Sequence, residues 1–206
     1  MKSVNMKLNK AAVSAFADEL NIHLLERIIA NAAACKSALN WKSLPLKQRA
    51  DAIRLLVDIA LDFRDEKSQE TECTDSYHSE NRSIAAYYMS GAKKFKFFRH
   101  VLTTDDFGKV IGIIVHEITH LLQEAGKSTL TIEQAEFAKN NYVQPGQNIA
   151  AYRGNLLEQE AHAVQGIIEK NFMPELKRVS AALQEFGRIS AGRDKARRQN
   201  NYQNAA

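Results

Sequence analysis

The sequence predicts a mainly α-helical domain with a small antiparallel sheet, an α+β fold, and three observations support this. Glycine and proline are scarce, at nine and three residues in a chain of 206, which disfavours a loop-rich β-sandwich. Hydrophobic residues make up 45% of the chain and charged residues 25%, so disorder over the whole length is excluded. Apolar residues also recur at three- and four-residue steps over several long segments, as they do in amphipathic helices.

Two helices are expected in the first third of the chain. Over residues 10–36 the apolar side chains follow the 3.6-residue period of a helix, at Val13, Phe16, Leu20, Leu24, Ile28 and Ala32. A second helix is expected from Pro45, which suits a first helical turn, through Leu61. The acid-rich segment 65–81 has no apolar periodicity, so we expect an exposed connection there.

Two short strands are expected over residues 83–89 and 94–102, with Gly91 in the turn between them. Both segments are rich in aromatic residues, which favour strands. In the second segment Phe95 and Phe97 alternate with lysines. This alternation predicts a half-buried strand at the edge of the sheet.

The broadest apolar face of the chain belongs to the next predicted helix. Thr104 is expected to cap it, with Asp105 and Asp106 in its first turn, and Gly126 is expected to end it. The apolar face consists of Phe107, Val110, Ile111, Ile114, Val115, Ile118, Leu121 and Leu122. We therefore expect this helix to be central and buried.

Further helices are expected downstream of this central helix. Thr131 and Gln134 have the spacing of a capping box at the start of a short helix. Asn155 is expected to cap a helix that runs to about residue 170, and Pro174 is expected to begin another.

The net charge of +4 belongs to the C-terminal segment. Residues 188–206 hold five Lys or Arg residues and one Asp, so the rest of the chain is neutral. We expect a single domain over residues 1–187, made of an N-terminal helical part (1–64) and a core (84–170), followed by a disordered basic tail. Contact with nucleic acid is expected, if at all, only through that tail.

The sequence gives no indication of membrane insertion or of general export. No segment approaches the roughly 20 apolar residues of a membrane helix, and the first 30 residues lack the apolar run of a signal peptide. We therefore expect a cytoplasmic protein, or one delivered by a specialised secretion system. Cys35 and Cys73 show no CxxC spacing and are expected to be reduced structural thiols.

An HExxH motif, His116-Glu-Ile-Thr-His120, lies within the predicted central helix. Histidines at i and i+4 project from the same side of a helix, so both imidazoles can bind one Zn²⁺ at about 2.0–2.1 Å. Glu117 would lie at the edge of the same site, where it can take a proton from water and pass it to a leaving amine. The motif predicts zinc as cofactor, His116 and His120 as ligands and Glu117 as the general base and acid.

A catalytic zinc site needs a third protein ligand. Glu158 and Glu160 lie on a second predicted helix and are both candidates. Because residues two apart point about 200° apart around a helix, only one of them can face the histidines. Glu158 could instead close the start of its helix, and His162 could be an ordinary helix residue.

Together, the two segments resemble the gluzincin class of HExxH zinc metallopeptidases. The run Glu158-Gln-Glu-Ala-His162 is similar to the ExxxD or ExxAN signature of that class. The resemblance implies that Glu158 is the third zinc ligand and that His162 takes the place of the residue that orients a zinc-bound histidine. It covers roughly residues 84–170 and implies a zincin-like fold. The metzincin pattern is excluded, because the sequence has Gln123 and Gly126 where that pattern requires glycine and histidine.

Substrate binding and oxyanion stabilisation have weaker candidates. Tyr152 and Arg153 precede the predicted ligand helix, and either could stabilise an oxyanion, with Tyr152 taken as the catalytic candidate. The resemblance to zincins implies that a protein or peptide substrate adds as a strand along Lys94–Leu102. The composition of that segment would favour acidic or aromatic substrate segments.

The expected function is therefore that of a zinc metalloendopeptidase, a hydrolase. In size and motif the chain resembles the stand-alone HExxH effectors and toxins of bacteria. The alternative is a zinc-binding regulatory or interaction protein without turnover. Glu117 argues against this alternative, because a structural zinc site has no use for a base and is usually closed by four protein ligands.

Overall fold

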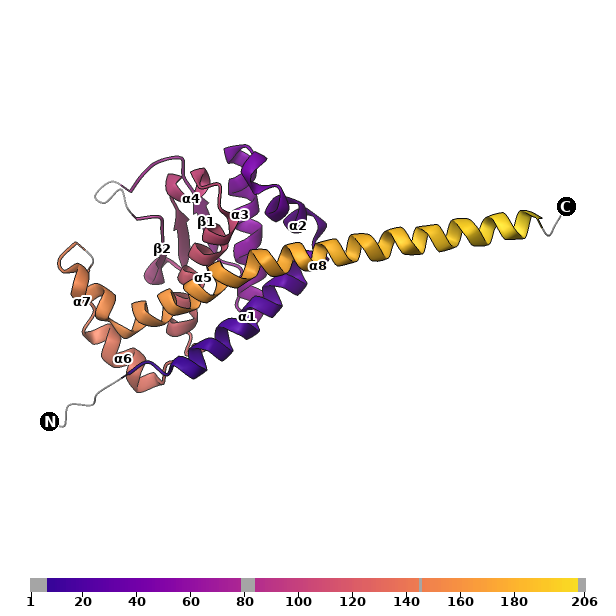
Figure 1. Ribbon diagram of the computed structural model, residues 1–206. Helices are drawn as coiled ribbons and strands as arrows, with labels where there is room; N and C mark the ends of the chain where they lie inside the picture. Colours follow the sequence, from indigo (N-terminus) through magenta and orange to yellow (C-terminus); the bar gives the residue numbers. More distant parts are fainter. Residues whose placement is uncertain (1–6, 79–83, 145, 204–206) are drawn as a thin grey trace.

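The computed structural model describes residues 7–78, 84–144 and 146–203, with side chains through Arg188. It is mainly helical, with one small sheet beside the central helices (Figure 1), which confirms the predicted α+β class. The expected start of the first strand at Ser83, and residues 79–81 of the expected connection, lie outside the described residues. None of the described helices is long and apolar enough to cross a bilayer.

The N-terminal part contains one helix more than expected. Helices α1 (Lys10–Ala30) and α2 (Ala32–Leu39) occupy the segment where the sequence predicts a single helix. Asn31 separates them, because its extended backbone ends α1 while its side chain accepts a 3.0 Å hydrogen bond from the Ala34 N–H and caps α2. Helix α3 (Leu46–Leu61) follows with Pro45 at the capping position. Short 3₁₀ turns lie at η1 (Trp41–Ser43), η2 (Asp62–Arg64) and η3 (Ser90–Ala92).

The sheet has three strands, β1 (Glu70–Cys73), β2 (Ala86–Met89) and β3 (Lys94–Phe97), in the order β1-β3-β2. The expectation of a purely antiparallel sheet is wrong, because β1 pairs in parallel with β3. Strand β1 lies in the acid-rich segment 65–81, where the sequence predicts an exposed connection. Its glutamates form ion pairs with Lys94 at 2.7 and 2.8 Å, so the charges that suggested a loop pair across the two strands.

The expectation that Lys94–Leu102 forms an edge strand is also wrong. Strand β3 is the central strand, with Phe95 and Phe97 fully buried. The chain then leaves the sheet and forms helix α4 (Arg99–Thr103). Both edges of β3 already pair with neighbouring strands, so a substrate strand cannot add to it.

Helix α5 (Phe107–Glu124) is the buried central helix that the apolar pattern predicts. Its N-cap is Asp106, whose carboxylate accepts hydrogen bonds from two backbone N–H groups of the first turn, whereas Thr104 ends α4. Gly126 ends the helix in the left-handed conformation with φ of 68°, as predicted.

The last three helices are α6 (Ile132–Asn140), α7 (Ile149–Gly154) and α8 (Leu156–Gln203). The capping box of Thr131 at the start of α6 is confirmed. The expected helix boundary at Pro174 is wrong, because α8 continues through it. Phe172 and Leu176 on either side are fully buried against the body, and this packing offsets the backbone hydrogen bond that proline removes.

Beyond Leu176, α8 projects away from the body (Figure 1). The sequence predicts a disordered tail from residue 188, whereas the structure continues the helix to Gln203. Residues 204–206 of that tail lie outside the described part of the chain.

Helices α5 and α8 pack closely and run antiparallel. The start of α5 lies against the middle of α8, where Gly108 and Gly112 face Glu169. A Cβ at Gly112 would clash with Cγ of Glu169, and one at Gly108 would lie 3.2 Å from its carbonyl oxygen. The end of α5 lies against the beginning of α8, where Gln123 bonds to the Leu157 carbonyl at 2.8 Å.

A single buried arginine joins the N-terminal helices to the segment before α5. The Arg49 guanidinium, on α3, donates to four backbone carbonyls and forms a 3.0 Å ion pair with Asp105. The Arg49 residue is 5% exposed. Two of those carbonyls, at Leu102 and Thr104, belong to the segment that leads into α5. The arginine thereby anchors the N-terminal end of the central helix.

We predict that Arg49→Met lowers the free energy of unfolding by about 2–4 kcal/mol. The substitution keeps an unbranched apolar side chain but leaves buried carbonyls without their donor. Urea denaturation followed by circular dichroism measures the change. Arg54→Met is the matched control on the same helix, because Arg54 pairs with Asp51 at the surface and its loss should cost less than about 1 kcal/mol. Equal losses for the two variants would contradict the anchoring role.

Candidate metal centre

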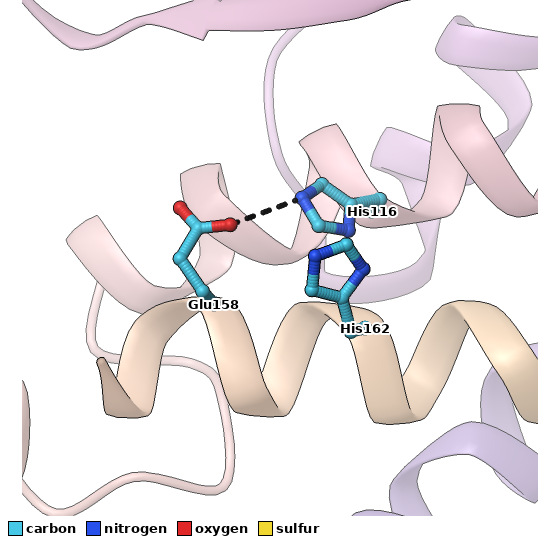
Figure 2. Close-up of side chains that lie close together, drawn as sticks. All are labelled: His116, Glu158 and His162. Atoms are coloured by element: carbon cyan, nitrogen blue, oxygen red, sulfur yellow. Dashed lines mark ion pairs between the residues drawn. The ribbon is translucent and has the colours of Figure 1, made fainter. Parts of the chain in front are cut away.

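Three of the sequence-predicted site residues meet where α5 faces the beginning of α8. His116 and His120 lie one helical turn apart on α5, with their Nε2 atoms 3.2 Å apart. The Glu158 carboxylate on α8 places one oxygen 3.5 Å from the His116 Nε2 and the other 3.4 Å from the His120 Nε2. Figure 2 shows the carboxylate of Glu158 directed at the ring of His116.

The separations of these donor atoms fit a zinc ion. With metal–ligand bonds of about 2.1 Å, neighbouring ligands of a tetrahedral centre lie roughly 3.4 Å apart. Two imidazole nitrogens and a carboxylate also form a donor set that suits Zn²⁺. Glu158 is 1% exposed, and its Oε2 atom has no hydrogen-bond partner among the described residues. A buried carboxylate oxygen that lies beside two imidazoles and accepts no hydrogen bond is the arrangement that a bound cation would satisfy.

His162 lies beside this group, one turn after Glu158 on α8. The centroid of its ring lies 4.5 Å from that of the His116 ring. Figure 2 shows the two rings close together. Ligand atoms of His116, Glu158 and His162 all lie within 4.8 Å of one another. The His120 Nε2 atom lies 3.2 Å from the His116 Nε2 atom and 3.4 Å from Oε1 of Glu158, whereas the His116 Nε2 atom lies nearest the other oxygen, Oε2. On these contacts His120 is the candidate ligand and His162 is its neighbour.

The other candidate ligand, Glu160, faces away from the histidines. It is fully buried and accepts hydrogen bonds from the Thr129 N–H at 2.7 Å and from Gln123 at 2.9 Å. It also accepts from the Thr129 hydroxyl. The rotation of α8 thus brings Glu158, and not Glu160, to the two imidazoles.

A cavity of about 680 Å³ opens beside the three donors and is large enough for a short length of peptide. Its wall includes Glu117, Tyr152 and residues of β2 and α6. Glu117 is 6% exposed, and its carboxylate makes no hydrogen bond within the described part of the chain. It is therefore available to a molecule in the cavity. Arg153 does not line this cavity.

Tyr142 is a site residue that the sequence analysis missed. Its hydroxyl donates a 2.8 Å hydrogen bond to Oε1 of Glu158, and its ring lies 5.9 Å from that of Tyr152. Tyr142 follows α6 in an irregular segment, where no helical period indicates which way a side chain points. The sequence indicates Tyr142 only in that it, like Tyr152, precedes the helix that carries Glu158.

The charges of the site support one another. Burial raises the pKa of Glu158. The contact with His116 and the charge of the nearby His120 lower this pKa by more, to about 2. The carboxylate is therefore anionic at neutral pH. Burial, together with the negative charge of Glu158, raises the pKa of both Tyr142 and Tyr152. Both phenols consequently remain protonated hydrogen-bond donors at neutral pH.

Comparison with known proteins adds no relative: no protein-family model, curated protein or solved structure matches this chain.

The ligand set can be tested by comparing Glu158→Gln with His162→Gln. The first change removes an anionic ligand oxygen, so we expect the zinc affinity to fall by more than about 100-fold, whereas the second should lower it by less than about 10-fold. Competition with a chromophoric chelator measures both affinities. Equal release of zinc from the two variants would instead support a ligand set that contains His162.

Proposed function

We propose that the protein is a zinc-dependent metallopeptidase of gluzincin type that hydrolyses a peptide bond in a protein substrate. The observation that carries this proposal is a buried carboxylate, Glu117, lining a cavity beside three residues whose donor groups have the spacing of zinc ligands. A purely structural zinc site needs neither the cavity nor the extra carboxylate.

His116, His120 and Glu158 would hold the metal, which when bound supplies a Lewis acid that polarises water and the substrate carbonyl. Glu117 takes one proton from the attacking water. The water oxygen bonds to the carbonyl carbon, and the C–N bond then breaks. Glu117 returns the proton to the amine nitrogen as it leaves, so that proton and charge balance over the cycle.

The two tyrosines have different roles in this proposal. Tyr142 donates to Glu158 and holds the carboxylate that faces the histidines. Tyr152 lines the same cavity and keeps its proton at neutral pH. It is therefore the candidate donor to the oxyanion that develops on the substrate carbonyl.

We propose that the substrate chain adds to β2 rather than to β3. Ala86, Tyr87 and Tyr88 of β2 line the cavity, and β2 is an outer strand of the sheet. An extended peptide can bond to the free backbone groups of such a strand. The expected preference for acidic segments loses its support, because Lys94 and Lys96 are already paired with glutamates of β1. An origin as a bacterial effector or toxin is proposed on the resemblance alone.

Glu117→Gln is expected to keep one bound zinc and the native fold while losing at least about 100-fold in rate, the usual contribution of general acid–base catalysis. Metal content by mass spectrometry and cleavage of a proteome-derived peptide library measure the two properties. Unchanged cleavage would exclude the proposed base. If both proteins hold zinc and neither cleaves any peptide, the protein is a zinc-binding regulatory protein without turnover.

Tyr152→Phe is expected to lower kcat by about 100-fold with little change in KM, because the phenol would contact the oxyanion only as it forms. Steady-state kinetics on a peptide found in the library screen measures both constants. Tyr142→Phe is the matched comparison and is expected to weaken zinc binding rather than to lower kcat at saturating zinc. A change confined to KM in Tyr152→Phe would assign that tyrosine to substrate binding.

A further inference from the structure

A buried chain of hydrogen bonds runs from Glu160 through Gln123 to His120. The Gln123 Oε1 atom lies 2.9 Å from the Nδ1 atom of His120. The Gln123 Nε2 group donates to Glu160 at 2.9 Å and to the Leu157 carbonyl at 2.8 Å. Gln123 is 6% exposed and Glu160 fully buried. Gln123 lines the cavity, but the mechanism above gives neither residue a role, so these hydrogen bonds need a separate explanation.

The hydrogen-bond partners determine which way the Gln123 amide points. A primary amide has two N–H donors on its nitrogen and accepts on its oxygen. A backbone carbonyl and a carboxylate, which accept hydrogen bonds, take both donors of Gln123. The amide oxygen must therefore face His120 and accept a hydrogen bond from it. The proton of a neutral His120 ring then lies on Nδ1, and the lone pair lies on Nε2.

Thr129 holds Glu160 in its accepting role. The Thr129 backbone N–H lies 2.7 Å from one oxygen of Glu160 and can only donate. The Thr129 hydroxyl bonds to the same oxygen, which leaves the other carboxylate oxygen for Gln123. Thr129, in the turn between α5 and α6, thus determines through Glu160 and Gln123 which nitrogen of the His120 imidazole carries the proton.

We propose that Glu160, acting through Gln123, is a positioning residue that fixes His120 in its Nδ1–H tautomer. The Nε2 lone pair of His120 is then directed at Glu158 and His116. The effect of Glu160 on zinc binding rests on the proposed function. That Nε2 atom is the one that lies 3.4 Å from Glu158. His116 has no comparable control, because its Nδ1 atom is buried without a hydrogen-bond partner among the described residues.

The isosteric change Glu160→Gln separates this role from simple packing. In this variant the amide oxygen at position 160 must still accept the hydrogen bond from the Thr129 N–H. The new NH₂ group then replaces the oxygen that faced Gln123, so that two NH₂ groups would face each other. Rotating the Gln123 amide removes the conflict with position 160 at the cost of its hydrogen bond to the Leu157 carbonyl, and it turns an N–H donor toward Nδ1 of His120. The ring must then carry its proton on Nε2, where it blocks metal binding.

The tautomer can be measured directly in metal-free, ¹⁵N-labelled protein. Long-range ¹H–¹⁵N NMR correlations distinguish the protonated from the unprotonated ring nitrogen, at a pH where the resonances no longer change. We expect Nδ1–H for His120 in the native protein and Nε2–H in Glu160→Gln. The double variant Gln123→Glu/Glu160→Gln should restore Nδ1–H, because a carboxylate at 123 can only accept from His120 and from the amide at 160, although it gives up the hydrogen bond to the Leu157 carbonyl. Glu175→Gln is the matched control on α8, since Glu175 bonds only to Asn21 at 2.7 Å among the described contacts.

Zinc affinity by chelator competition provides the second measurement. Glu160→Gln should weaken zinc binding by about 10–100-fold, as loss of a residue that orients a ligand usually does, and the double variant should recover most of the loss. If Glu160→Gln does not fold, Gln123→Met removes the whole amide, both the acceptor that faces His120 and the donors to Glu160 and Leu157, and should abolish the preference for Nδ1–H. An unchanged tautomer in Glu160→Gln or Gln123→Met, or an Nε2–H ring in the native protein, would overturn the inference. Failure of the native protein to bind zinc would overturn the proposed function and leave the tautomer result standing.

Discussion

The antiparallel packing of α8 against α5 fixes where the side chains of the site lie. Its register is set at one end by Gly112, where only the absence of a Cβ leaves room for Glu169. At the other end Gln123 bonds to the Leu157 carbonyl, immediately before Glu158. These two contacts hold the helices in a register that places Glu158 opposite the histidines of α5. The rest of the fold supports this pair of helices, and Arg49 holds the segment that leads into α5.

The site also shows how a buried carboxylate is kept anionic. Removing Glu158 from water costs free energy, and two imidazoles and the Tyr142 hydroxyl offset that cost. One carboxylate oxygen still has no hydrogen bond among the described residues, which leaves room for a cation. Glu117 differs, because it lines the cavity and makes no hydrogen bond with the described residues. In the proposed mechanism the two carboxylates have different tasks, since Glu158 would hold the metal and Glu117 would exchange a proton.

The sequence-based predictions failed where pairing between distant segments decided the structure. The glutamates of β1 favour solvent exposure, so the sequence predicts a connection there. In the structure they pair with Lys94 of β3, which follows more than 20 residues later. The same pairing moved β3 from the edge to the centre of the sheet. Pro174 was expected to mark a helix boundary, but the burial of Phe172 and Leu176 carries α8 through it.

The sequence by itself determined the local arrangement of the site. A 3.6-residue period and an i, i+4 spacing place His116 and His120 on one side of α5 whatever the rest of the chain does. It could not decide between Glu158 and Glu160, which point in different directions from one helix. That choice depends on the rotation of α8 about its own axis, which its tertiary contacts determine, among them those with α5 and with Thr129. The contact of Tyr142 with Glu158 and the outer position of β2 in the sheet were likewise decided by the tertiary structure, because segments without a repeating pattern carry no local rule for where they pack.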